Sequence, residues 1–442
     1  MSERLPKVLV VSITVWRDDS PIRTLPELFS CWERDRVAQI YTRAGLPDNS
    51  ICDRYFRIDE NSVMKSVFNR SAVTGKTVEN QQNSSTVTKD EQKSLSAENA
   101  RYAAAHRRHS WLMTLMREVV WRLGKWKSKE LDDFVRNFDP DVIFVPIYPF
   151  YYMERIQTYL IKKFKKPVVC FIADDNYTYK PCKGNLLSYL HRFMLRRYVR
   201  KEVPLCDEFF VMTPMAKREY DKLFSVQSKL LTKAIDFENK EYIPYTYNAQ
   251  RPIKMVYTGK LVIGRDAAMA EIAKALSEIN KDRVRIELDI YAPDNPSEKV
   301  QQALNVPGCR LCGGVSKDKV SEIQANADVL VFAESLSKKF KNAARLSFST
   351  KLTDYFASGK CIFALGSRDI APMDYLIAED AAVVATEYSQ IKDVLLRLCD
   401  NPALLEEYGR KAYECGKRNH NREDVYDLFI KTLSDTAKKE KN

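Results

Sequence analysis

The run RLSFSTKLTDYFASGKCIFALG, residues 345–366, gives the clearest indication of local structure in this chain. Ser349 and Thr350 are favoured N-cap residues, and apolar side chains recur after them at helical spacing. Gly359 stands where a left-handed C-cap is expected, and residues 361–365 are apolar enough to form a buried strand. Another apolar run precedes this stretch. The predicted order is therefore strand, loop, helix and strand, which is typical of α/β domains.

The beginning of the predicted helix is a candidate site for an anion. Backbone N–H groups at a helix N-terminus lack partners within the helix and carry partial positive charge. Ser349, Thr350 and Lys351 at this end would favour a phosphate or pyrophosphate. Asp354, one turn later, is positioned to accept hydrogen bonds from a sugar hydroxyl. Capped helices occur in every α/β domain, so an ordinary structural helix is the alternative.

The segment STKLTDYFASGKCIFALG resembles the donor-site segment of GT-B glycosyltransferases close to family 4. In that family a carboxylate begins a helix that ends in Ala-Ser-Gly-Lys before the next strand. Asp354 falls at the second Glu of the family's paired pattern, whereas Leu346 replaces the first. The resemblance implies the GT-B fold, an α/β architecture of two Rossmann-like domains whose parallel sheets face a central cleft. It also implies a nucleotide-sugar-dependent transferase in which Asp354 holds the nucleotide ribose.

Length and composition agree with a globular protein of two domains. The chain has 442 residues, of which 45% are hydrophobic and 29% charged. Its net charge of +12 indicates an anionic partner, such as nucleotide phosphates, anionic lipid headgroups or nucleic acid. No motif for stacking bases or reading a groove accompanies the charge, so nucleic acid is not expected. No apolar run is long enough to predict a membrane-spanning helix.

Residues 1–240 are predicted to form an N-terminal Rossmann-like domain that binds the acceptor. Asp174 and Asp175 follow an apolar run, at the carboxyl edge where ligands bind in doubly wound sheets. They are the candidate catalytic residues, because a carboxylate there can orient or deprotonate an acceptor hydroxyl. Two alternatives stay open: the pair caps the next turn, or it holds a metal, for which no third ligand is evident. The expected buried strands are residues 7–13, 37–41, 54–58, 141–147, 167–173 and 208–212.

Two unusual segments interrupt this domain. Residues 69–105 are rich in Ser, Thr, Asn, Gln, Lys and Glu, which predicts a mobile polar insertion. Residues 106–129 repeat apolar side chains at helical spacing among seven basic residues. Such a basic amphipathic helix suits an anionic membrane surface, unless its apolar stripe packs on the core. The predicted membrane-surface residues are Arg107, Arg108, Trp111, Arg117, Arg122 and Trp126.

Residues 241–252 lack helical periodicity and contain two prolines, which predicts a linker between domains. Residues 253–420 are then expected to form a C-terminal Rossmann-like domain that binds the donor. A C-terminal helix and tail follow over residues 421–442. The strands expected in the second domain are residues 253–258, 284–291, 310–312, 328–332, 361–365 and 382–385.

The run YTGKLVIGR, residues 257–265, resembles the loop of the same GT-B family that supplies basic residues to the donor pyrophosphate. Lys260 and Arg265 are the matching cations, and Gly259 lets the backbone come close to the ligand. Gly314 and Val315 follow another predicted strand, in a region whose backbone contacts base and ribose in related enzymes. A plain turn would have the same pattern. The predicted donor-binding residues are Gly259, Lys260, Arg265, Gly314, Val315, Ser349, Thr350, Lys351 and Asp354.

The predicted function is transfer of a sugar from a nucleotide-sugar donor to a hydroxyl of a lipid-linked or growing cell-surface glycan. The run RVAQIYTRAGLPDNSICDRYFRI, residues 36–58, looks like the N-terminal part of glycosyltransferases that build bacterial surface polysaccharides such as capsules. We expect a cytoplasmic protein, peripheral on the inner face of the cytoplasmic membrane, with no metal or cofactor besides the nucleotide-sugar co-substrate. Two other classes stay open: a GT-B sugar-nucleotide epimerase, which needs no acceptor, and a nonenzymatic membrane-surface binding protein.

Overall fold

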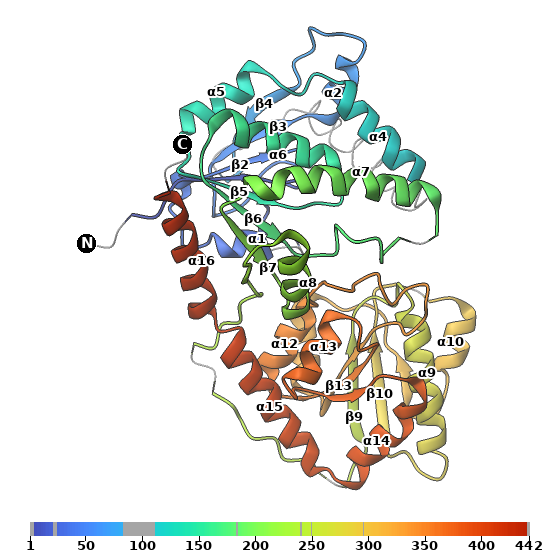
Figure 1. Ribbon diagram of the computed structural model, residues 1–442. Coiled ribbons are helices and arrows are strands. Elements are labelled where there is room, and N and C mark those ends of the chain that lie inside the picture. Colours follow the sequence, from blue (N-terminus) through green and yellow to red (C-terminus); the bar gives the residue numbers. More distant parts are fainter. Residues whose placement is uncertain are drawn as a thin grey trace. The chain divides into compact units, whose positions relative to one another are not determined.

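The computed structural model describes residues 4–20, 24–82, 111–182, 184–238, 241–248, 250–294 and 296–439 (Figure 1). Helices and strands alternate along these residues, which confirms the predicted α/β class. The chain divides into two compact units. Unit 1 comprises Met1–Val211, Tyr220–Lys229 and Tyr426–Asn442, and unit 2 comprises Met212–Glu219 and Leu230–Val425.

Unit 1 contains a sheet of eight strands in the order β4-β3-β2-β1-β5-β6-β7-β8. The pairs from β3 to β7 are parallel, and Val8 at the centre pairs with Val37 on one side and Val142 on the other. The central strands are buried along their whole length, as expected when helices cover a parallel sheet. The strands are β1 (Val8–Val11), β2 (Val37–Tyr41), β3 (Arg54–Ile58), β4 (Gly75–Val78), β5 (Val142–Pro146), β6 (Val168–Ile172), β7 (Glu208–Val211) and β8 (Lys229–Leu230).

Helices of unit 1 bury their apolar faces on this sheet and on one another. Phe429 of α16 contacts the rings of Phe29, Trp32, Phe144 and Phe210 at centroid distances of 5.1, 5.6, 5.8 and 5.9 Å. α4, α6 and α7 pack together elsewhere in the unit (Figure 1). The helices are α1 (Thr24–Leu28), α2 (Glu60–Ser66), α4 (Trp111–Leu123), α5 (Lys129–Phe138), α6 (Tyr151–Phe164), α7 (Leu186–Glu202) and parts of α8 (Pro214–Phe224) and α16 (Arg422–Ala437).

The structure corrects the predicted polar insertion at residues 69–105, because β4 lies within it. β4 runs antiparallel to β3 at the edge of the sheet, where Val78 pairs with Tyr55 and is buried. Lys76 and Thr77 between its ends are exposed. An edge strand needs a partner on one side only, so a short and largely polar run can form it. Residues 83–105 lie outside the described part of the chain.

The predicted helix over residues 106–129 also needs correction, because α4 ends at Leu123. Gly124 follows directly, and glycine favours the end of a helix over its interior. Ser128 then caps a separate helix, α5, by accepting a hydrogen bond from a backbone N–H of its first turn. Trp126 therefore lies in the connection between two helices rather than on a helical stripe.

Unit 2 contains a six-stranded sheet, entirely parallel, in the order β11-β10-β9-β12-β13-β14. Buried aliphatic side chains of these strands form its core together with those of α9 and α14. The strands are β9 (Ile253–Thr258), β10 (Ile286–Tyr291), β11 (Cys309–Leu311), β12 (Val329–Ala333), β13 (Cys361–Leu365) and β14 (Val383–Ala385). The helices are α9 (Arg265–Ile279), α10 (Glu298–Leu304), α11 (Lys317–Ala325), α12 (Thr350–Ser358), α13 (Ala371–Ala378), α14 (Ile391–Asp400) and α15 (Ala403–Asn419).

The described residues of the predicted linker, 241–248 and 250–252, form no helix or strand and pack on unit 2. Arg251 donates to both carboxylate oxygens of Asp328, at 2.6 and 2.7 Å, and Tyr245 also donates to that carboxylate. Asp328 in addition accepts from the backbone N–H of Lys254 at 2.7 Å. These bonds explain why an irregular segment has a defined course, and they keep the buried Asp328 ionised.

Candidate functional site

In unit 2, loops that follow neighbouring parallel strands meet at the carboxyl edge of the sheet. β9 lies between β10 and β12, so the loops that leave these strands are neighbours. α9 begins at Arg265, after the β9 loop, and α12 begins at Thr350, after the β12 loop. Neither helix has an N-cap side chain that accepts from its first N–H groups. This edge therefore combines two helix N-termini that favour negative charge.

Lys351 brings a cation from the first turn of α12 to this edge. Its Nζ stands 4.5 Å from the ring centroid of Tyr257 and 3.4 Å from the Tyr257 Oη. Burial, with a smaller contribution from the nearby charge of Arg265, lowers the pKa of Lys351 to about 8. Both effects penalise the ammonium form in the free protein. An anion bound beside Lys351 would offset them, so the position favours a phosphate as ligand.

Gly259, directly after β9, allows the backbone to approach Lys351. Its φ of 147° is one that side chains rarely adopt, and a Cβ atom there would lie 2.0 Å from the Lys351 Nζ. Gly264 makes the second close approach, with a φ of 79° and a position for Cβ only 2.5 Å from the Ser335 Oγ. Glycine is favoured at both points because the β9 loop passes close to Lys351 of α12 and to Ser335 after β12. The predicted close approach of Gly259 to a ligand stays a prediction.

Arg265 is held rigidly at the beginning of α9. Its guanidinium donates to both carboxylate oxygens of Glu334, at 2.5 and 3.1 Å. Glu334 is the first residue after β12 and is only 6% exposed. A bidentate pair of this kind fixes the plane of the guanidinium group. The direction of its remaining N–H groups is therefore fixed as well. The charges of Arg265 and Lys351 are balanced by those of Glu334 and of the nearby Asp294, so the positive character that remains at this edge comes from the two helix N-termini and the exposed Lys260.

Three residues of this edge were not predicted from the sequence: Tyr257, Glu334 and Asp294. Asp294 accepts from the backbone N–H of Leu261 at 2.8 Å, and its other oxygen, Oδ1, is buried without a hydrogen-bond partner among the described residues. Polar residues just after a predicted strand were the available signal, since Glu334 follows β12 and Asp294 follows β10 closely. An unsatisfied buried oxygen at a sheet edge suits a ligand hydroxyl or N–H group.

The other predicted donor-binding residues differ in how exposed they are. Gly314 approaches the β10 loop, since a Cβ atom there would lie 3.1 Å from the Pro293 Cα. Val315 is half-buried beside it. Lys260 is exposed, and its carbonyl oxygen accepts from the Tyr257 hydroxyl at 2.8 Å. The remaining residues belong to α12: Ser349 is its N-cap, and Thr350 and Asp354 are exposed on it.

Leu346, which replaces the first Glu of the resembled pattern, is fully buried. Its carbonyl oxygen accepts from the Thr213 hydroxyl at 3.2 Å. Arg345 beside it is also buried and pairs with both oxygens of Glu219, at 2.6 and 2.9 Å. This segment therefore packs into unit 2 and offers no carboxylate to a ligand at position 346.

The predicted catalytic pair lies in unit 1, just after β6. Asp175 accepts from the backbone N–H of Thr178 at 2.8 Å and from its hydroxyl at 2.5 Å, which is the turn-capping role named as an alternative. Asp174 is exposed, and its carbonyl oxygen accepts from the Tyr220 hydroxyl at 3.2 Å. The structure therefore gives Asp175 a structural partner and leaves the carboxylate of Asp174 at the surface of the unit.

The predicted membrane-surface residues separate into different environments. Arg117 pairs with Glu60 and packs 5.2 Å from the ring centroids of Phe150 and Tyr152. Trp126 is 4% exposed. The prediction that these two lie at the surface is therefore wrong, because α4 turns the Arg117 side toward α6 and ends before Trp126. Of the rest, Trp111 is half-buried, Arg122 is exposed, and Arg107 and Arg108 lie outside the described residues.

The apolar stripe of α4 is largely exposed. Leu112, Met116, Val119 and Leu123 are 57%, 60%, 51% and 52% exposed, whereas Glu118 and Trp121 are fully buried. The stripe does not pack on the core, because the opposite side of the helix does so. On the neighbouring helix α7, Leu186, Leu190 and Phe193 are 81%, 48% and 50% exposed. We call these seven side chains the α4–α7 apolar surface.

Within the described ranges, no helix is both long and apolar enough to cross a bilayer. The same residues contain no group of three or more His, Cys, Asp or Glu side chains arranged to hold a metal ion.

Several solved structures match this chain in fold over nearly their whole length. Sucrose-phosphate synthase from Thermosynechococcus elongatus matches with a TM-score of 0.58 and 11% identity, over 96% of this chain and 97% of that one. HepE from Anabaena in complex with UDP matches with a TM-score of 0.59 and 9% identity, over 97% and 100%. The chain has the GT-B fold. α,α-Trehalose-6-phosphate synthase from Burkholderia multivorans matches as well, with a TM-score of 0.56 and 12% identity over 98% and 97%.

The GT-B fold confirms the architecture that the resemblance implied. No protein-family model and no curated protein sequence matches the chain. The similarity to family 4 within the GT-B enzymes stays a prediction.

Proposed function

We propose that the chain is a glycosyltransferase that moves a sugar from a nucleotide-sugar donor to a hydroxyl of a glycan acceptor. The observation that carries this proposal is the cluster of Lys351, Gly259 and Arg265 at the carboxyl edge of unit 2, in a chain with the GT-B fold. Two helix N-termini, with Lys351 and Arg265 as hydrogen-bond donors, suit a diphosphate. We call this cluster the donor site.

The chemistry of transfer explains why a nucleotide sugar fits these residues. The nucleoside diphosphate gains negative charge as its bond to the sugar breaks, and fixed cations lower the free energy of that transition state. Arg265 is oriented beforehand by Glu334, so it loses little conformational freedom on binding. Lys351, with its lowered pKa, is still mainly protonated at neutral pH. The buried Oδ1 of Asp294 would accept from a hydroxyl or N–H group of the donor.

A uridine nucleotide is the first donor class to test. HepE has the same fold and is described in complex with UDP. A trehalose-phosphate synthase from Burkholderia vietnamiensis with this fold is described as UDP-forming; it matches with a TM-score of 0.56 and 12% identity, over 98% of each chain. UDP-sugars are therefore the favoured donors for this chain.

The acceptor is proposed to be a lipid-linked or growing cell-surface glycan, reached at the inner face of the cytoplasmic membrane. Two observations support this finer proposal. The α4–α7 apolar surface exposes side chains large enough to enter a lipid headgroup layer. The net charge of +12 attracts the chain to an anionic surface. Asp174, exposed after β6, is the candidate residue for orienting the acceptor hydroxyl.

A thermal-shift panel tests the donor site. Purified protein is melted with UDP, GDP, ADP, CMP and TDP, because a ligand that binds only the folded state raises the melting temperature. We expect UDP to stabilise the wild type, and Lys351→Ala and Arg265→Ala to remove the shift. No stabilisation by any of the five nucleotides would contradict the proposal.

Product analysis separates transfer from epimerisation. A transferase consumes a UDP-sugar and releases UDP in step with the appearance of glycosylated acceptor. An epimerase would change the sugar nucleotide in the absence of acceptor, and this result would replace the proposed activity by the alternative one.

Vesicle flotation tests the membrane surface. We expect binding to phosphatidylglycerol vesicles to be weakened by Leu112→Ser/Met116→Ser/Leu190→Ser, since each change removes exposed apolar area from the α4–α7 apolar surface. Leu223→Ser/Ile243→Ser/Val284→Ser is the matched control, because these side chains are 44%, 83% and 40% exposed elsewhere. Equal flotation of both triple variants would contradict a role for this surface.

A further inference from the structure

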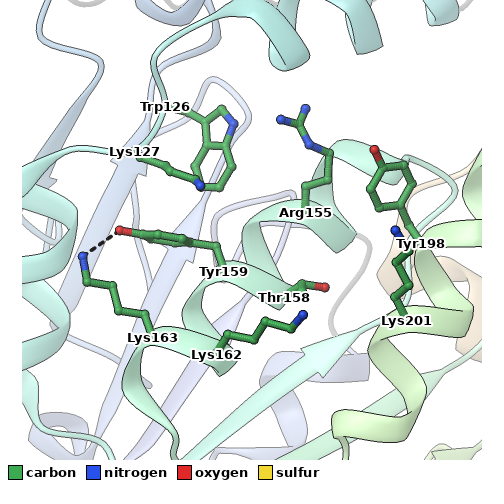
Figure 2. Close-up of a pocket in the computed structure, with 9 residues that line it drawn as sticks. All are labelled: Trp126, Lys127, Arg155, Thr158, Tyr159, Lys162, Lys163, Tyr198 and Lys201. Carbon is green, nitrogen blue, oxygen red and sulfur yellow. Dashed lines mark hydrogen bonds between the residues drawn. The ribbon is translucent and has the colours of Figure 1, made fainter.

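Unit 1 has a second cationic region, far from the donor residues in the sequence and made by α6, α7 and the connection between α4 and α5. Figure 2 shows its central hollow, whose volume is about 500 Å³, within the range of about 300–1,000 Å³ usual for ligand pockets. Five basic side chains surround it: Lys127, Arg155, Lys162, Lys163 and Lys201. Among the residues that the structure describes, no acidic side chain lines this hollow.

Two further hollows adjoin the central one. One, of about 280 Å³, shares Tyr198 and Lys201 with it and adds Arg122 and Arg197. The other, of about 430 Å³, shares Lys127 and adds Lys125, Lys129 and Arg136, with Glu130 and Asp132 as its acidic residues. Because neighbouring hollows share lining side chains, the three adjoin one another. We call the three together the basic groove.

Most cations of the central hollow are not neutralised by the protein. Lys163 pairs with Asp132 at 2.5 Å. Among the described residues, Lys127, Lys162 and Lys201 form no ion pair, and Arg155 donates to the carbonyl oxygen of Trp121 at 3.2 Å. Like charges gathered around one hollow destabilise the folded chain. A bound polyanion would offset that repulsion. The arrangement of these charges therefore favours ligand binding and does not stabilise the fold.

The aromatic rings of the hollow indicate what kind of anion fits. Lys127 Nζ stands 4.7 Å from the ring centroid of Tyr159, and Lys163 Nζ stands 5.2 Å from the same ring. Tyr198 is stacked on Tyr151 with centroids 5.5 Å apart, and Trp126 is buried. Lys127 and Tyr151 thus each cover a ring face on which a nucleic-acid base would stack, and Lys163 donates to the Tyr159 hydroxyl at 2.9 Å. The groove presents mainly ammonium and guanidinium groups, which suits a ligand rich in acidic groups.

From these observations we propose that the basic groove binds an acidic polysaccharide, a chain whose sugars carry carboxylate or phosphate groups. Three adjoining hollows lined by basic side chains favour a polymer over a single lipid headgroup, which would fill one hollow. The proposal rests on the proposed function in one respect, that the bound polymer is the acceptor glycan or its product. Held in the groove, the polymer would stay bound to the enzyme between successive additions.

Isothermal titration calorimetry with the full-length chain tests the groove directly. The probes are a galacturonic acid oligomer and, as the neutral probe, a glucose oligomer of equal length. We expect the acidic oligomer to bind and the neutral one not to bind. Lys127→Ala/Lys162→Ala/Lys201→Ala should weaken the acidic oligomer at least about tenfold, because three charge-assisted contacts are removed.

The matched control is Lys222→Ala/Lys281→Ala/Lys431→Ala, which removes three exposed lysines outside the groove and changes the net charge equally. It should retain the affinity of the wild type. An equal loss in both triple variants would show that net charge alone attracts the oligomer, and would overturn the proposal. Tighter binding of a single-stranded DNA oligonucleotide or of phosphatidylglycerol vesicles, lost in the same groove variant, would overturn the assignment to a glycan.

The response to UDP, recorded by thermal shift on the same samples, separates this proposal from the proposed function. If UDP stabilises the wild type but the acidic oligomer does not bind to it, only the proposal about the groove is overturned. A wild type that binds the oligomer through the groove and responds to no nucleotide supports the groove and contradicts the glycosyltransferase assignment.

Discussion

The donor site of unit 2 and the basic groove of unit 1 both present basic side chains, but they are built in opposite ways. At the donor site, Lys351 is half-buried and Arg265 is locked in a bidentate pair with Glu334. In the groove, Lys127, Lys162 and Lys201 are exposed. The first region gains selectivity from a fixed geometry, whereas the second gains attraction from several mobile charges. Burial of the cation, rather than its presence, is what distinguishes a site for one small ligand from a surface for a polymer.

The largest expected effect on the affinity for UDP is that of replacing Gly259 at the donor site. In Gly259→Ala the new methyl group would occupy the place of the Lys351 Nζ, so the ammonium group must move away. Losing a charge-assisted contact to phosphate costs about 1.5–3 kcal/mol, or about 10- to 150-fold in the Kd for UDP. Calorimetric titration measures this. Gly184→Ala is the control, because it also has a positive φ, of 70°, and a Cβ atom there meets no neighbour. An unchanged Kd in Gly259→Ala would mean that the close approach at the β9 loop has no part in binding.

The next largest difference is expected in how strongly salt weakens ligand binding at the two regions. Exposed charges are screened when the Debye length falls from about 10 Å at 0.1 M salt to about 3 Å at 1 M, whereas partly buried charges are screened much less. We expect the affinity of the groove for a galacturonic acid oligomer to fall by more than about tenfold over this range, and that of the donor site for UDP to fall only a few-fold. Titrations at both salt concentrations test this. Equal salt dependence of the two affinities would contradict the distinction between partly buried cations at the donor site and exposed cations in the groove.

A smaller effect is expected from pH, and only at the donor site. Burial lowers the pKa of Lys351 to about 8, so below pH 8 the free protein already carries the ammonium charge. Above pH 8 the free protein holds a neutral amine, which must take up a proton when the diphosphate binds. The affinity for UDP should therefore be steady below pH 8 and fall by up to about tenfold per pH unit above it. Lys351→Ala should bind weakly with no such dependence, and a wild-type profile that is flat to pH 10 would contradict the assigned role.

Much of the fold was predictable because its strands are buried on both faces. Residues 37–41, 54–58, 253–258 and 361–365 were predicted with the bounds of β2, β3, β9 and β13, since each is rich in apolar, aromatic and β-branched residues. β4 was missed because an edge strand needs little apolar character. The end of α4 was placed too late, although Gly124 and Ser128 carried the signal for a break.

The site was predictable where local sequence fixes local geometry. Gly359 ends α12 with a φ of 61°, as its position predicted, and Lys351 follows from the helix beginning at Thr350. Glu334 was not predictable as the partner of Arg265, because their contact depends on how two loops distant in sequence fold together. The side of α4 that faces the core was also not predictable. Its exposed leucines and its buried Glu118, 3.5 Å from His191, reflect the packing of α6 and α7.

The most direct test of the donor site compares two lysines of similar environment at opposite ends of α12. Lys351 stands 4.5 Å from the ring centroid of Tyr257, and Lys360 stands 4.6 Å from that of Tyr245, with burial lowering the pKa of both. The measurement is the Kd for UDP by calorimetric titration of Lys351→Ala and Lys360→Ala. Lys351→Ala should weaken binding by about 10- to 150-fold and Lys360→Ala should leave it unchanged, because only the first lies at a helix N-terminus beside Arg265. Equal affinities in the two variants would contradict the claim that this edge of unit 2 binds the nucleotide.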